Sequence, residues 1–136
     1  MRKPGQDELA NIETQLLGCS LQDIQRKICE AGLGRLWVAI ESGYSDPSLA
    51  LETAARNACI SSSRMNVLLR KACQLTFRQL LIRMRLLAAV QALKDDPDAR
   101  IEQLATRVGF GDPSSFRRQF KRRVGCSAKA FQQNSS

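Results

Sequence analysis

Two stretches of the chain, about 49–72 and about 100–123, repeat one apolar pattern of two short helices around a tight turn. Each has a small residue in its first helix and an apolar residue in its turn: Ala55 and Ile60 in the first, Ala105 and Phe110 in the second. The small residue permits close approach of the second helix, and the apolar one fills the gap between the two. Crossing helices joined by about four residues form a helix-turn-helix. The repeat therefore predicts two such units.

The segment between the two units predicts a single longer helix. Apolar residues recur at helical spacing over about 76–94, and Asp95-Asp96-Pro97-Asp98 ends the pattern. A helix of about 19 residues is roughly 28 Å long. Successive major-groove faces of B-DNA lie about 34 Å apart. This connector is therefore long enough to hold both second helices on one face of a duplex.

The rest of the chain is also helical in pattern, and no stretch alternates as a strand does. Leu9, Ile12 and Leu16 form one narrow stripe, and Ser20 with Asp23 resembles a capping box. A further apolar set runs from Leu33 to Ile40, and a final turn spans Ala128 to Gln132. We expect an all-α fold of roughly eight or nine helices, with two helix-turn-helix subdomains, a long connector helix and an N-terminal helical extension.

Charge divides the chain into an acidic start and a basic remainder. Residues 1–52 hold 5 Lys/Arg and 8 Asp/Glu, a net charge of −3, and residues 53–136 hold 16 and 5, a net charge of +11. The distribution indicates a polyanion bound by the later region, or a basic surface that keeps the protein in solution. Charge alone leaves both interpretations open.

Several classes of function find no support. The chain has no histidine, which removes the commonest general base and imidazole metal ligation. Its five cysteines show no C-x-x-C pair or zinc-like spacing and are expected to be reduced thiols. We expect no enzyme activity, no metal and no cofactor. Apolar runs are too short for a membrane span, and no apolar segment follows the basic start, which predicts a cytoplasmic protein without a signal peptide.

These residues resemble the AraC/XylS family of bacterial transcription regulators. The resemblance covers about 33–132 and is most specific from Gly109-Phe110 to Phe120-Lys121, with Arg83-Met84-Arg85-Leu86 also matching in the connector. It divides the chain into an extension (1–32), a DNA-binding domain (33–132) and a tail (133–136). Cys59 and Gln74 stand where the family has glycines, and Ala128 replaces a proline. Non-glycine residues in such turns cost about 1 kcal/mol each.

The exposed faces of the two second helices supply the candidate DNA contacts. Candidates for reading bases are Ser62, Ser63, Asn66, Val67, Ser114, Arg117 and Arg118. Candidates for holding phosphates are Ser61, Arg64, Arg70, Lys71, Arg78, Arg83, Lys121 and Arg122. An asparagine can pair bidentately with adenine, and the fork of an arginine suits guanine. Arg118 matches a family position that commonly reaches base edges. The simpler interpretation of each is a solvated side chain. Arg85 is interpreted as a structural residue that ties the connector to a subdomain.

The resemblance implies a sequence-specific regulator that binds double-stranded DNA without chemistry. An activator is expected because the family mostly contains activators, and activation implies contact with RNA polymerase. The alternative is an adaptor whose helix-turn-helix units contact an acidic protein. Residues 1–32 are either a linker left from a larger regulator with a missing effector domain, or an extension that docks on the domain or mediates self-association.

Overall fold

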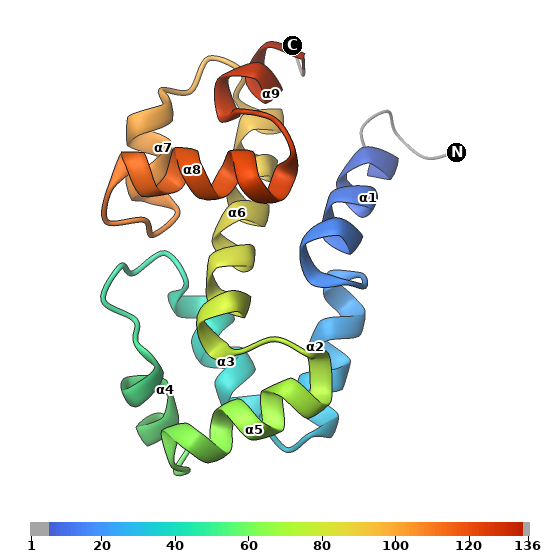
Figure 1. Cartoon of the computed structure of the whole chain (residues 1–136), viewed down its shortest axis with the longest axis vertical. Helices are drawn as coiled ribbons and strands as arrows, with labels where there is room; N and C mark the ends of the chain where they lie inside the picture. Colours follow the sequence, from blue (N-terminus) through green and yellow to red (C-terminus); the bar gives the residue numbers. More distant parts are fainter. Residues whose placement is uncertain (1–5, 135–136) are drawn as a thin grey trace.

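A computed structural model describes residues 6–134 of the chain (Figure 1). Within that range every regular element is a helix, which confirms the all-α fold class. In chain order the helices are α1 (Gln6–Leu17), α2 (Leu21–Glu30), α3 (Gly34–Gly43), α4 (Leu51–Asn57), α5 (Ser62–Cys73), α6 (Phe77–Asp95), α7 (Ile101–Arg107), α8 (Pro113–Val124) and α9 (Ala128–Asn134). None of these is long and apolar enough to cross a membrane.

Helix α6 is the spine of the molecule. Figure 1 shows it through the centre, with α7, α8 and α9 around its C-terminal half and α3, α4 and α5 towards its N-terminal end. Ten of its residues are buried, distributed around most of its circumference, as expected for a helix packed on several sides. Its start is a full capping box. Thr76 Oγ1 accepts a hydrogen bond from the Gln79 N–H at 3.2 Å, and Gln79 Oε1 accepts one from the Thr76 N–H at 3.0 Å.

The two helix-turn-helix units close their turns in the same way. The N–H of the apolar turn residue donates to the carbonyl oxygen of the small residue five positions earlier: Ile60 to Ala55 at 3.0 Å, and Phe110 to Ala105 at 3.0 Å. Both alanines are buried, as the repeat predicts. The residue before each apolar one, Cys59 or Gly109, has a positive φ, of 62° and 106° respectively. The turns thus share one backbone solution, although only the second uses the glycine that this conformation favours.

Aromatic residues make the core of the second unit distinctive. Phe110 and Phe116 have ring centroids 5.3 Å apart, and Phe116 and Phe120 have centroids 5.6 Å apart. Phe120 continues the chain of rings to Phe131 of α9 at 5.9 Å. Tilted and edge-on pairs at these distances add to the burial of each ring. Helix α8, the second helix of this unit, is therefore held by a series of packed rings that reaches α9, the last helix described.

The N-terminal helices pack into the same core as the two units. Helix α1 lies beside α6 and α8, and α2 lies against α3 and α5. Ile12, Leu16, Ile24 and Ile28 are all buried. The Ser20 hydroxyl accepts a hydrogen bond from the Asp23 N–H at 3.1 Å, which is the cap expected from the sequence. Residues 6–30 are therefore docked on the domain.

Candidate nucleic-acid interface

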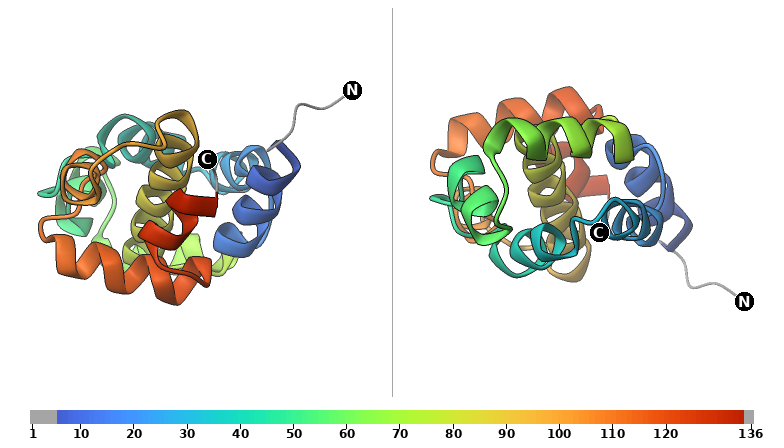
Figure 2. Two further views of the ribbon diagram at one scale, coloured as in Figure 1. Left: turned by 90° about the horizontal axis from the view of Figure 1, so that it is seen from above. Right: turned by 90° about the horizontal axis from the view of Figure 1, so that it is seen from below.

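The two recognition helices, α5 and α8, lie on the same side of the molecule. Figure 1 shows both crossing the front of the fold, and the views from above and below in Figure 2 place them along one common edge. Each begins with a side-chain cap. The Ser61 hydroxyl accepts from the Arg64 N–H at 3.2 Å, and Asp112 Oδ1 accepts from the Ser114 N–H at 3.2 Å. Pro113 is the first residue of α8, as the sequence predicts.

Helix α8 turns a strongly basic face outward. Phe116 and Phe120 are fully buried on its inner face. The exposed side chains are Ser114, Arg117, Arg118, Lys121 and Arg122, all of which the sequence proposed as DNA contacts. Arg118 is close to the centre of the face opposite the two phenylalanines, because 3.6 residues make one turn.

Helix α5 turns a less charged face outward. Its exposed side chains are Ser63, Arg64, Val67, Arg70 and Lys71, and Ser62 is half-buried. Val67 is 51% exposed, which is unusual for a large apolar residue on a helix that also buries Met65 and Leu69. Val67 and Arg118 are each the sixth residue of their helix. The two units therefore present an apolar and a cationic side chain at equivalent positions.

Asn66 is a correction to the predicted base-reading set. Its side-chain oxygen, Oδ1, accepts a hydrogen bond from the backbone N–H of Phe77 at 3.0 Å, and the residue is only partly exposed. Bidentate pairing with adenine needs both the oxygen and the nitrogen of the amide. The oxygen is occupied because Phe77 is the first residue of α6, whose N–H has no partner within the helix. Asn66 joins α5 to the connector.

Arg117 has a partner that the sequence analysis did not foresee. Its guanidinium forms an ion pair with the carboxylate of Glu102 on α7. The backbone N–H of Glu102 and the neighbouring Arg117 both hold the pKa of the Glu102 carboxyl below its usual range. The pair is exposed, and Arg117 faces α7 rather than standing clear of the fold. Arg117 is thus less free to reach a base than Arg118.

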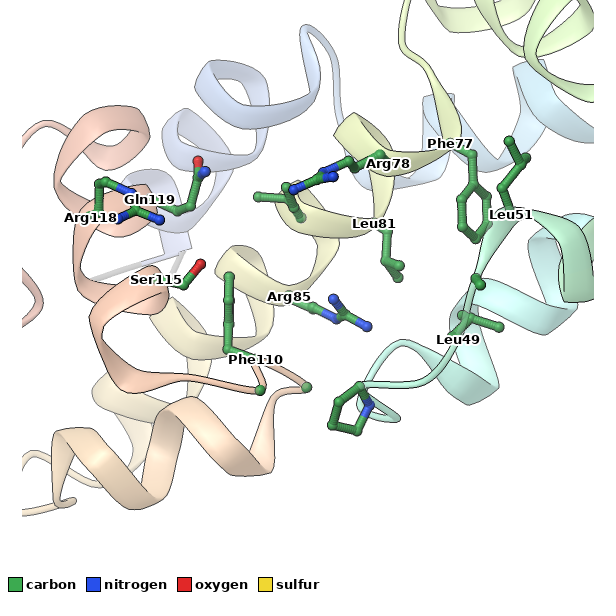
Figure 3. Close-up of a pocket in the computed structure, with 15 residues that line it drawn as sticks. Leu49, Leu51, Phe77, Arg78, Leu81, Arg85, Phe110, Ser115, Arg118 and Gln119 are labelled. Carbon is green, nitrogen blue, oxygen red and sulfur yellow. The ribbon is translucent and has the colours of Figure 1, made fainter. Parts of the chain in front are cut away.

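A groove of about 530 Å³ lies between the two helix-turn-helix units, and residues of α6 form part of its lining. Figure 3 shows Arg118, Ser115 and Gln119 of α8 on one side and Arg78 of α6 further along the groove. Ser115 and Gln119 are half-buried and were not among the predicted contacts. Their spacing of four residues, beside Arg118, is the sequence signal that places them on the groove side of α8. Arg78 is exposed, as a phosphate contact requires.

Arg85 lies at the floor of this groove and is structural, as predicted. Its Nε donates to the Tyr44 carbonyl oxygen at 2.7 Å, and its Nη2 donates to the Asp46 carbonyl oxygen at 3.0 Å. Burial lowers the pKa of the Arg85 guanidinium, and the nearby Asp46 partly opposes that change. Gly109 packs closely on Arg85 and Tyr44. The connector, the segment after α3 and the second turn thus meet at one side chain.

Arg83 also has an intramolecular partner. Its Nη1 donates to the Leu16 carbonyl oxygen of α1 at 2.7 Å, and the residue is half-buried. This predicted phosphate contact is therefore turned towards the N-terminal helices. Within residues 8–134 no group of three or more cysteine, aspartate or glutamate side chains is placed to hold a metal ion. The five cysteines are free thiols, and burial raises the pKa of Cys73.

Two helix-turn-helix units on one side of a connector helix define the class of bipartite DNA-binding domains. Comparison with known proteins gives the family. A helix-turn-helix domain model matches residues 54–134, more than half of the chain. The chain belongs to this AraC-type helix-turn-helix family of transcription regulators. The second helix-turn-helix unit lies wholly within the matched segment, and the first begins a few residues before it.

The chain resembles a curated relative and several solved structures. The HTH-type transcriptional regulator AlkR of Acinetobacter baylyi is 32% identical over 92 residues, which cover 68% of this chain but 30% of AlkR. The C-terminal domain of the response regulator yesN from Fusobacterium nucleatum superposes with a TM-score of 0.67 at 23% identity, covering 71% of this chain and 93% of that one. The C-terminal domain of AraT, a response regulator from Geobacillus stearothermophilus, gives 0.70 at 24%, covering 74% and 82%. The structural matches support the fold.

Proposed function

We propose that this chain binds double-stranded DNA sequence-specifically, with α5 and α8 in successive major grooves. The observation that carries the proposal is the common orientation of the two recognition helices on one side of a 19-residue connector. A helix of that length spans roughly 28 Å, close to the separation of about 34 Å between major-groove faces one turn apart. The exposed cations of both helices supply the phosphate contacts.

The two helices divide the task unequally. On α8, Arg118 and Ser114 face bases while Lys121 and Arg122 hold phosphates. On α5, Val67 meets a thymine methyl group and Ser62 and Ser63 contact base edges, whereas Arg64, Arg70 and Lys71 hold the backbone. Ser61, at the start of α5, and Arg78 of α6 add further contacts to phosphates. Asn66 is excluded from this set because its oxygen is engaged.

The regulatory role follows from the family. AlkR is named as a transcriptional regulator. We propose that this chain is likewise a regulator in a bacterial cytoplasm, and an activator that acts through contact with RNA polymerase. Residues 6–30 are packed into the domain core, so an effector domain or second copy that binds through them would contact the outer surface of α1 and α2.

The test is the salt dependence of binding to duplex DNA. A pool of random duplexes is selected on the protein, and the dissociation constant of the selected duplex is measured by fluorescence anisotropy from 50 to 200 mM KCl. With 6–10 phosphate contacts we expect affinity to fall by roughly 10³–10⁵ over that range. The selected site is expected to be bipartite, with centres one helical turn apart.

The matched control is Arg26→Gln, since Arg26 is an exposed cation on α2 outside both units. It should leave the salt slope unchanged, whereas Lys121→Gln should lower the slope by about 1. A flat salt dependence with no selected sequence would refute DNA binding and favour the adaptor alternative. A single half-site would refute the use of both helices.

A further inference from the structure

A second basic site lies at the junction of α1, α6 and α8, where the C-terminal end of α8 meets the N-terminal helix. A cavity of about 230 Å³ is lined there by Gln15, Leu16, Arg83, Arg122 and Arg123, and is called the arginine cavity below. Three of these five side chains carry a positive charge, and none is a carboxylate. The cavity is distinct from the groove between the two units, which has different lining residues.

Hydrogen bonds between the helices hold the cavity walls in place. Gln15 Nε2 donates to the carbonyl oxygens of Arg123 at 2.8 Å and Val124 at 3.1 Å. Arg83 of α6 donates a hydrogen bond to the Leu16 carbonyl oxygen, so α1 is the acceptor in this contact. The last turn of α8 and the last turn of α1 are thereby tied together. The arginine cavity is part of the fold, because its walls are fixed by contacts between three helices.

The positive charge in this cavity is not compensated within the described part of the chain. No carboxylate there forms an ion pair with Arg83, Arg122 or Arg123. The Nε atom of Arg83 is buried and has no hydrogen-bond partner. Burial and, secondarily, the charge of Arg123 lower the pKa of Arg83. A buried guanidinium donor without a partner costs free energy, as does the approach of like charges. An anion in the cavity would offset the repulsion between these like charges.

We propose that the arginine cavity binds one phosphate group. Guanidinium groups suit this ligand because their planar N–H donors pair with phosphate oxygens. The phosphate comes from the DNA backbone beside the C-terminal end of α8, or from a free phosphate-bearing molecule. In the first case the inference rests on the proposed function, and it brings α1, which lies outside the matched residues 54–134, into the DNA interface. In the second case it is independent of DNA binding.

The first arm of the test uses inorganic phosphate without DNA. Thermal unfolding of the full chain is followed at pH 7 in sodium phosphate and in sodium chloride of equal ionic strength. At about ten times its dissociation constant, phosphate should raise the Tm by roughly 4 °C. Phosphate also stabilises proteins in general by exclusion from their surface. The readout is therefore the difference between the wild-type chain and Arg122→Gln, whose exposed side chain is not needed for folding.

The second arm uses duplex DNA and compares the salt slopes of Arg83→Gln, Arg122→Gln and the control Arg26→Gln. Each of the first two should lower the slope by about 1, and the control should not change it. Arg83→Gln also loses the contact to Leu16, so circular dichroism must first show that it folds. Both variants are needed because Arg122, as an exposed cation of α8, is expected to touch DNA whether or not the cavity binds a phosphate. Arg83 reaches a phosphate only through the cavity.

The results separate the two sources and the failure of either proposal. A lower slope for both variants supports a DNA phosphate in the cavity. A Tm rise that Arg122→Gln reduces, with an unchanged DNA slope for Arg83→Gln, supports a free phosphate-bearing molecule. If the wild-type chain does not bind DNA, the proposed function fails while the first arm still tests the cavity. Equal Tm rises in the wild-type chain and Arg122→Gln, with a slope change confined to Arg122→Gln or absent, overturn the inference.

Discussion

Arg85 donates a hydrogen bond of 2.7 Å from Nε to the backbone carbonyl oxygen of Tyr44, and this contact joins the connector to the end of α3. The two residues are 41 positions apart. The turn of the second unit closes over them, because a Cβ atom on Gly109 would lie 2.7 Å from Arg85 Nε and closer still to the Tyr44 oxygen. One side chain therefore links the connector, the segment that precedes the first helix-turn-helix unit and the turn of the second unit.

Replacing three glycines of the second unit by alanine should change the free energy of unfolding by different amounts, according to the backbone conformation and the space at each position. Gly109→Ala should lower the free energy of unfolding by about 3 kcal/mol or more, since it combines a positive φ with a clash against backbone. Gly125→Ala has the positive φ but open space and should cost about 1 kcal/mol. Gly111→Ala has neither and should be neutral. Urea unfolding measures all three, and equal effects at Gly109 and Gly111 would contradict the packing described.

Two non-glycine residues with positive φ predict a gain in stability. Cys59 has φ 62° and Gln74 has φ 63°, and both end helices. Cys59→Gly and Gln74→Gly should each raise the free energy of unfolding by about 0.5–1 kcal/mol, because glycine adopts this conformation without strain. Ala58→Gly, at a neighbouring residue with φ −89°, is the control and should destabilise. A loss of stability in both test variants would show that the side chains compensate for the strain.

Substitutions of two neighbouring residues on α5, Asn66 and Val67, should distinguish a structural role from a DNA-binding role. Asn66→Ala should lower the free energy of unfolding by about 1–2 kcal/mol, since the Phe77 N–H loses its acceptor. Its folded fraction should bind DNA as the wild-type chain does. Val67→Ala should change stability by less than about 0.5 kcal/mol yet weaken binding to the selected duplex. The opposite assignment would follow if Asn66→Ala folded normally and lost preference for adenine.

The arginines at positions 117 and 118 should differ although they are adjacent. Arg118→Ala should weaken binding to the selected duplex by about 1–3 kcal/mol and relax the preference at one base pair. Arg117→Ala should relax preference less, because its guanidinium already pairs with Glu102. Binding to duplexes mutated at single positions measures both. If Arg118→Ala weakened every duplex equally, its side chain would be a phosphate contact.

Much of the fold could be predicted because its determinants are local. The connector was expected over about 76–94 and is Phe77–Asp95, since the apolar spacing and the acidic stop act within the segment itself. The Asp112-Pro113 start of α8 and the positions of Cys59 and Gln74 in turns were predictable for the same reason. The family pattern further indicated that Arg85 is structural.

The remaining details depend on contacts between distant residues. Asn66 and Phe77 are brought together only when α5 packs under the start of α6, so helical spacing alone placed Asn66 on the exposed face. The pairing of Arg117 with Glu102 depends on how α7 crosses α8. One contact of α1 with α8 uses the carbonyl oxygens at the end of α8, which Gln15 binds and which leave no trace in the side-chain pattern.

Val67 and Arg118 occupy equivalent positions on α5 and α8 but differ chemically, and this difference affects the orientation in which the protein would bind along DNA. Two recognition helices with identical side chains, related by two-fold symmetry, would bind a symmetric site in either direction. In the proposed interface Val67 of α5 meets a thymine methyl group and Arg118 of α8 meets a guanine edge, and α6 joins the two helices in a fixed order. The bound protein would then have a front and a back along the double helix. Inverting its site in a promoter would reverse which end faces the transcription start, even though every contact with the bases was preserved.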